Sequence, residues 1–143
     1  MSRTFGVCFV AAAVAFGVSV MAIDTERPTP EHQNLMKSNA ALNSVNAIRG
    51  NIEAKDYDAI AKDALALQGN LKKVEAFWTQ RKITDAIDFA RSGVKAASEL
   101  EAAAQAKDDT RILRAQRTVP MACNQCHLVH RLIVPLEGRF EIM

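Results

Sequence analysis

The segment "YDAIAKDALALQGNLKKVEAFW", residues 57–78, decides the fold class of this chain. Its apolar residues recur at alternating steps of three and four. They are Tyr57, Ile60, Ala64, Leu67, Leu71, Val74 and Trp78. This spacing places them along one face of an α-helix that packs against neighbouring helices at a shallow angle. The segment therefore predicts one long helix with a buried stripe.

The same alternation of apolar residues returns twice toward the C-terminus. One stripe spans residues 83–97 and the other spans residues 112–133. Residues 31–53 also favour a helix, although their apolar stripe is less regular. Pro120 predicts a kink or a restart in the last helix, because proline removes one backbone hydrogen bond and crowds a carbonyl.

Short polar segments separate the predicted helices. Asp56, Thr84 and Asp109 are predicted N-caps, because their side-chain oxygens can accept hydrogen bonds from the free N–H groups of the first turn. No run of residues alternates between apolar and polar at every second position, which is the pattern of a half-buried strand. We therefore expect an all-α fold, an antiparallel up-down-up-down four-helix bundle.

The N-terminal segment has the features of a secretory signal. Arg3 precedes a short apolar run that ends in small residues at Ala22, and a polar, proline-containing segment follows. We expect residues 1–22 to be a signal peptide and the protein to be periplasmic. An uncleaved membrane anchor is the alternative, and it would leave the same domain outside but tethered. Cys8 belongs to this segment.

The remaining 121 residues, with a formal charge of +1, suffice for one domain. We assign residues 23–30 to an N-terminal linker, residues 31–134 to the helical domain and residues 135–143 to a C-terminal tail. Phe140 and Ile142 of the tail are expected to pack back on the bundle. Charge so close to zero gives no support for nucleic-acid binding, and no membrane span is expected once the signal is removed.

The stretch "MACNQCHLVHR", residues 121–131, concentrates the reactive side chains. Within it, "CNQCH" fits the Cys-x-x-Cys-His pattern of covalent c-type haem attachment, in which two thiols bond to the haem and the histidine binds its iron. On a helix, Cys123, Cys126 and His127 are three and four residues apart, so they share one surface. We expect Cys123 and Cys126 to hold one haem c and His127 to ligate its iron.

Other interpretations of this motif compete with haem. A thioredoxin-like redox pair needs a strand that leads into the helix, and none is predicted. A disulfide between Cys123 and Cys126 would close a very small loop and stabilise little. Zinc would have to take its ligands, with His127 or His130, from two turns of one helix, whereas tetrahedral zinc sites draw on separated segments. A helical scaffold without haem is a further hypothesis.

The segment "CNQCHLVHR" on the last helix of an exported four-helix bundle resembles the class II c-type cytochromes, which include cytochrome c prime and its low-spin, methionine-ligated relatives. The resemblance covers nearly all of the mature chain and implies haem attached near the C-terminus of the last helix. An aromatic residue often stands three positions after the haem-binding histidine in this family. Here that position is His130, which we expect at the haem edge or the surface.

The resemblance also indicates the second iron ligand. In the low-spin relatives a methionine of the first helix fills that position, and "QNLMKSNAA" is similar to the segment that carries it. Met36 is therefore the expected ligand, with core packing as its alternative role. His32, one turn earlier, is a second candidate. Arg131 is expected either to pair with a haem propionate or to face water.

Ligation by His127 and Met36 would give a low-spin iron and a one-electron carrier that docks transiently with redox partner proteins. The alternative is a five-coordinate protein, similar to cytochrome c prime, that binds nitric oxide or carbon monoxide. No general base, nucleophile or substrate pocket is evident in the sequence, so we do not expect an enzyme. The resemblance also permits a homodimer.

Overall fold

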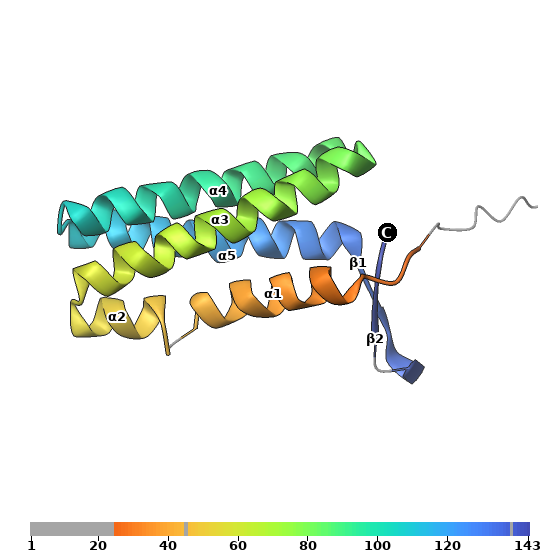
Figure 1. The fold of residues 1–143 in the computed structure, drawn as a ribbon, viewed down its shortest axis with the longest axis horizontal. Coiled ribbons are helices and arrows are strands. Elements are labelled where there is room, and N and C mark those ends of the chain that lie inside the picture. The colour runs from red at the N-terminus through yellow and green to blue at the C-terminus, as the bar shows by residue number, and fades with distance from the viewer. Residues whose placement is uncertain (1–24, 45, 138) are drawn as a thin grey trace, which may run out of the picture.

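The structure is a computed structural model, and it describes residues 25–44, 46–137 and 139–143. The expected signal peptide, residues 1–22, lies outside the described residues. The described chain is mostly helical (Figure 1). Its elements are α1 (Pro30–Leu42), α2 (Ile48–Ala54), α3 (Tyr57–Arg81), α4 (Thr84–Gln105), α5 (Asp109–His130), β1 (Arg131–Val134), the 3-10 turn η1 (Pro135–Glu137) and β2 (Arg139–Ile142).

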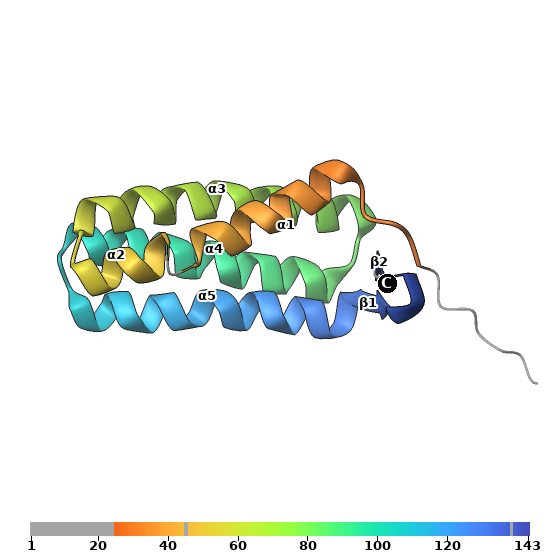
Figure 2. The same ribbon diagram turned by 90° about the horizontal axis from the view of Figure 1, so that it is seen from below.

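Three long helices run back and forth and form the body of the molecule (Figure 1). α3 packs against α4, and α4 packs against α5. α1 and α2 follow one another along α3 (Figure 2). The stripe of α3 is buried as predicted, from Ile60 to Trp78, with Tyr57 partly buried. None of the described helices is long and apolar enough to cross a membrane.

The predicted helix over residues 31–53 is in fact two helices. α1 ends at Leu42, where the N–H of Asn43 donates to the carbonyl of Asn39 at 3.2 Å. Beyond it, Ser44 accepts a hydrogen bond from the N–H of Asn46 through its side-chain oxygen, at 3.2 Å. Short polar side chains offer the backbone such alternatives to the helix. The described chain therefore has five helices instead of the four expected.

The predicted N-caps are partly correct. Asp56 caps α3, and its carboxylate accepts from the N–H of Ala59 at 3.0 Å. The predictions for Thr84 and Asp109 are wrong by one residue: each opens its helix, and the caps are Ile83 and Asp108. α5 continues through Pro120 as one helix, so the chain does not restart there.

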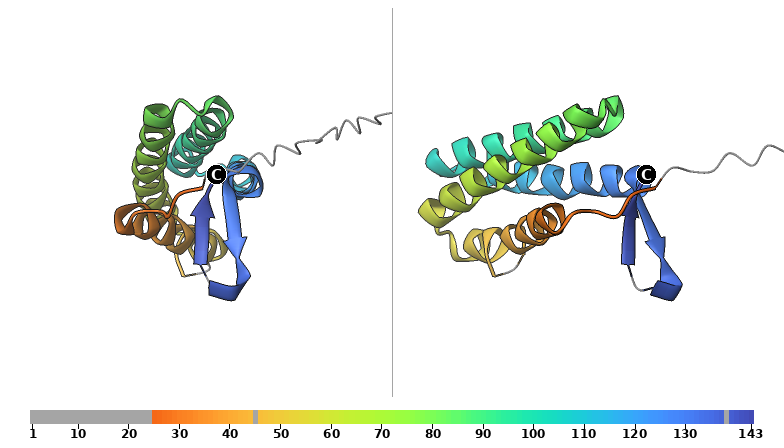
Figure 3. Two further views of the ribbon diagram at one scale, coloured as in Figure 1. Left: turned by 90° about the vertical axis from the view of Figure 1, so that its right-hand side faces the viewer. Right: turned by 45° about the vertical axis from the view of Figure 1, so that its right-hand side comes forward.

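The end of the chain differs most from the prediction. α5 stops at His130, and an antiparallel hairpin of β1 and β2 projects from that end of the helices (Figure 3). The run Leu132-Ile133-Val134 is apolar and mostly β-branched, which favours a strand. The all-α prediction, with the helical domain extending to residue 134, is therefore incomplete.

The predicted linker and tail pair with each other. Glu26 and Ile142 form a β-bridge, with N–H to carbonyl distances of 2.9 and 2.8 Å. Ile142 is 8% exposed and packs on the bundle, as expected. The expectation for Phe140 is wrong, because that side chain is 42% exposed and lies beneath the guanidinium of Arg131.

The core consists of two clusters of unequal size. The larger fills what we call the closed half, where α2 meets the first part of α3, the end of α4 and the start of α5. Its members are Ile48, Ile60, Ala64, Leu67, Leu71, Ala96, Ala97, Leu100, Ala103, Ala104, Ile112, Ala115 and Val119. The smaller lies in the open half, toward the hairpin. Its members are Val74, Trp78, Ala86, Ala90 and Ile142.

Candidate functional site

A cleft of about 800 Å³ occupies the open half of the molecule. α1 packs mainly on α3, and α5 packs mainly on α4, so the cleft lies between α1 and α5. Its volume is in the range of small-molecule and cofactor sites. Apolar side chains form much of its wall. They include Leu67, Leu71, Val74, Trp78, Phe89, Ala90 and Val119.

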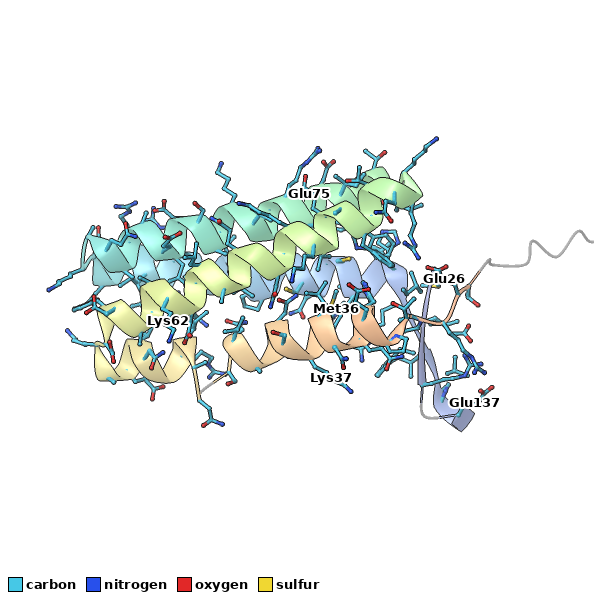
Figure 4. All side chains as sticks on the ribbon, viewed as in Figure 1. Glu26, Met36, Lys37, Lys62, Glu75 and Glu137 are labelled. Carbon is cyan, nitrogen blue, oxygen red and sulfur yellow. The ribbon has the colours of Figure 1, made fainter. Side chains whose placement is uncertain are left out.

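All five predicted site residues line this cleft. Cys123, Cys126 and His127 reach it from α5, and Arg131 reaches it from the start of β1. Met36 reaches it from α1, on the side of that helix that faces α5 (Figure 4). Met36 and Cys126 are both partly buried against the smaller core cluster. The fold thus brings together residues that are about 90 positions apart in the sequence.

The two cysteines are free thiols in an apolar setting. Burial raises the pKa of Cys123, and burial with the nearby Cys123 and Asp85 raises the pKa of Cys126 to about 11. Cysteines of dithiol redox sites have lowered pKa values, because only the thiolate reacts. A thioredoxin-like role for this pair is therefore disfavoured.

The zinc alternative also lacks support. Across residues 25–44, 46–137 and 139–143, no three His, Cys, Asp or Glu side chains gather closely enough to hold a metal ion. A site that needs only one imidazole and one thioether from the protein does not require such a group. Axial ligation of a haem iron is of that kind.

The surroundings of His127 favour its neutral form. Burial lowers its pKa, and the positive charge of Arg131 lowers it further. A neutral imidazole is the form that binds a metal. His127 therefore has the protonation state that an iron ligand needs.

His32, the other candidate ligand, is held against an aromatic ring. Its ring centroid lies 4.1 Å from that of Phe77, and the guanidinium of Arg81 stacks on the same Phe77 at 3.6 Å. Burial lowers the pKa of His32, and the positive charge of Arg81 lowers it further. His32 and Met36 both line the cleft from α1, one turn apart.

His130 lines the cleft but is buried, so the surface position that the sequence allows is wrong. Its Nε2 lies 3.0 Å from a carboxylate oxygen of Asp85, and its Nδ1 lies 3.2 Å from the carbonyl oxygen of Met143. The N–H of Met143 donates to the carbonyl of His130, and the imidazole packs against Trp78 at 5.0 Å. His130 thus joins α4, α5 and the end of β2, a role that no short-range pattern reveals.

Two residues of the cleft wall carry buried polar atoms that have no hydrogen-bond partner among the described residues. These atoms are the side-chain oxygen of Asn39 and the indole nitrogen of Trp78. Buried polar atoms are nearly always hydrogen-bonded, to protein, water or a bound group. The orphaned pair therefore indicates that the cleft accommodates something with polar atoms. The sequence gives only a weak signal for Asn39, which follows Met36 by three residues on α1.

Arg131 lies at the rim of the cleft. Its side chain is exposed, and its guanidinium stacks on Phe140 at 3.4 Å. A separate groove between α3 and α4 is lined mainly by polar and charged residues and includes an ion pair of Arg91 with Glu75 at 2.8 Å. None of the predicted site residues lies in that second groove.

Comparisons with protein-family models, with curated proteins and with solved structures find no match for this chain.

Proposed function

We propose that this protein is a periplasmic monohaem c-type cytochrome that carries one electron at a time. The observation that carries the proposal is a juxtaposition: the Cys-x-x-Cys-His segment faces an apolar cleft whose opposite wall presents Met36. An apolar cleft of this volume suits a flat, largely apolar cofactor. The orphaned polar atoms of Asn39 and Trp78 fit a group that also carries polar substituents.

Each site residue has a distinct role in this proposal. Cys123 and Cys126 would attach haem c covalently, and neutral His127 would ligate its iron from α5. Met36 would offer its thioether from α1, and Arg131 would pair with a carboxylate at the rim. Haem, when bound, supplies one-electron exchange between ferric and ferrous iron.

The protein around the cleft would set the properties of that exchange. Apolar walls exclude water, and a thioether ligand favours the ferrous state and so raises the potential. Burial keeps His127 neutral, so ligation needs no proton release at neutral pH. The two ligands would come from α1, which packs on α3, and from α5, which packs on α4. Such a framework would limit movement between the oxidised and reduced states.

We propose the class II cytochrome bundle as the finer description of the fold. In it, α1 and α2 together would take the place of the first helix, and α3, α4 and α5 would be the other three. The polar break after Asn43 would then be a local interruption of that helix.

Absorption spectra of the haem-loaded protein test the ligand assignment. The proposal predicts a low-spin spectrum that carbon monoxide leaves unchanged, and Met36→Ala should convert it to a high-spin spectrum that shifts with the gas. Met121→Ala is the matched control, because Met121 is 60% exposed and lies outside the cleft. A high-spin wild-type spectrum that responds to carbon monoxide would instead support the gas-binding alternative and leave Met36 a packing role.

A further inference from the structure

The outer face of α5 carries side chains that the bundle does not bury. They follow one another at steps of three and four, so they share one stripe of the helix. The members are Arg114, Arg117, Met121, Gln125 and Leu128, and all are exposed. α5 lies along one edge of the bundle, with α4 as its main neighbour (Figure 2).

The end of this stripe nearest the cleft is apolar. Leu128 follows His127 directly in the chain and is 83% exposed, and Met121 is 60% exposed. Val129 at the end of α5 is also exposed, as are Leu132 and Ile133, which lie on opposite faces of β1. Exposed apolar side chains that gather beside polar ones mark interaction sites, whereas scattered single ones do not. We call this surface, with the stripe of α5, the α5 face.

The α5 face is positively charged although the whole chain is nearly neutral. Residues 110–136 contain four arginines and no Asp or Glu. Arg111 is neutralised by Glu99 at 2.8 Å, but among the described residues Arg114, Arg117 and Arg131 form no ion pair. The hairpin carboxylates, Glu137 and Glu141, pair with Arg139, and Glu137 also pairs with Arg27. Among the described residues, neither carboxylate forms an ion pair with an arginine of α5.

We propose that the α5 face docks a protein partner whose surface is acidic around an apolar centre. Opposite charge guides such partners together and fixes their orientation, while the apolar centre supplies contact area. In one respect the inference rests on the proposed function: the face adjoins the Cys-x-x-Cys-His segment, so the partner is taken to be the redox partner.

Two other occupants fit the face less well. A second copy would bring the same arginines against each other, because a two-fold interface places the same patch on both subunits. An anionic bilayer is recognised by clusters of roughly four to eight basic residues, whereas this face offers two arginines without an ion pair among the described residues, Arg114 and Arg117. Charge complementarity therefore favours an acidic protein.

The test uses the mature haem-loaded protein and a plant-type ferredoxin, an acidic one-electron protein, as the probe. Amide chemical shifts should change at Gln125, Leu128 and Val129 when the probe is added at low salt. Replacing Arg114→Glu and Arg117→Glu together should weaken binding about tenfold or more. The matched control is Arg49→Glu with Lys62→Glu, an equal charge change at exposed sites on α2 and α3 (Figure 4 labels Lys62).

Several results would overturn the docking proposal. They are the absence of shifts at the α5 face, shifts centred on the groove between α3 and α4, and equal weakening by the control variant. A dimer in sedimentation that the Arg114 and Arg117 changes dissociate would assign the face to a second copy. Binding to phosphatidylglycerol vesicles that the same changes abolish would assign it to a lipid surface.

The covalently bound haem of every sample is quantified. Failure of the docking proposal can then be distinguished from failure of the electron-carrier proposal. A haem-loaded protein that does not bind the probe contradicts the α5 face alone. A chain without haem that still binds the probe at Leu128 supports docking at the α5 face and contradicts the electron-carrier proposal.

Discussion

The two halves of this molecule differ in how completely the space between their helices is filled. In the closed half, the chain fills the interior with its own side chains, and Ile48, Leu100 and Ile112 are at most 1% exposed. In the open half, a small cluster borders a cleft of about 800 Å³. Protein interiors are normally close-packed, so a cleft of this size lined with apolar side chains is a candidate binding site.

The first prediction compares the same substitution at two leucines of the larger cluster, one away from the cleft and one that lines it. Leu100→Ala removes a completely buried side chain from the closed half and should lower the free energy of unfolding of the haem-free chain by about 3 to 5 kcal/mol. Leu71→Ala, at a residue that lines the cleft, should cost only about 2 kcal/mol, because one side of that leucine already lacks packing partners. Urea unfolding measures both. Equal losses would mean that the cleft is closed in solution.

The second prediction concerns the joint between the open half and the hairpin. His130→Ala leaves the carbonyl of Met143 without its imidazole partner and should cost about 2 kcal/mol. Hydrogen exchange should show lost protection in β2 but not in the core of α4. Asp85→Asn is the control and should cost less stability, because the Asp85 side chain is about half exposed. Loss of protection spread evenly over all helices would contradict this local role of His130.

The third prediction tests how much room surrounds two helical glycines, one of which lines the cleft. Gly69 lies in the interior of α3, and a methyl group there would meet nothing within 4 Å, so Gly69→Ala should stabilise by about 1 kcal/mol. Gly93 lines the cleft, and a methyl group there would lie 3.4 Å from the methyl carbons of Leu71. Alanine has the same higher helix propensity at position 93, but Gly93→Ala should stabilise the fold less than Gly69→Ala. Thermal unfolding distinguishes the two, and a larger gain at Gly93 would contradict the packing described here.

The smallest expected effect is a pH dependence confined to the open half. Burial lowers the pKa of His32 and His127 in the folded chain. As the pH falls, these two imidazoles are therefore protonated at a higher pH in the unfolded chain than in the folded chain. Stability is full above the unfolded pKa of about 6.5 and falls as the pH drops below it. Urea midpoints of the haem-free chain at pH 7.5 and 5.5 measure the fall. Replacing both histidines with glutamine should reduce it, and an unchanged fall would assign the effect to other groups.

The sequence predicts what depends on local spacing. The stripe from Ile60 to Trp78 is buried because a period of three to four residues fixes one helix face whatever lies opposite. The motif at Cys123 is equally local, and it led directly to three residues of the cleft wall. Met36 required a family resemblance, because nothing in the spacing of α1 distinguishes it from a core methionine.

The remaining features depend on contacts between distant segments. The environment of His130 depends on Asp85 and Met143, 45 and 13 positions away, and no period in the sequence encodes that. The β-bridge of Glu26 with Ile142 joins the two ends of the described chain in the same way. The break after Asn43 is different, since its asparagine and serine are visible in the sequence but compete only weakly with a helix.

The mass of the denatured chain decides whether the open half holds a covalently attached haem, as we propose. After expression with a haem-maturation system, we expect a single species that is heavier than the mature chain by one haem and keeps this added mass in denaturant. Replacing both Cys123 and Cys126 with alanine should remove that added mass. A wild-type chain at its unmodified mass, with both cysteines still open to alkylation, would contradict the claim.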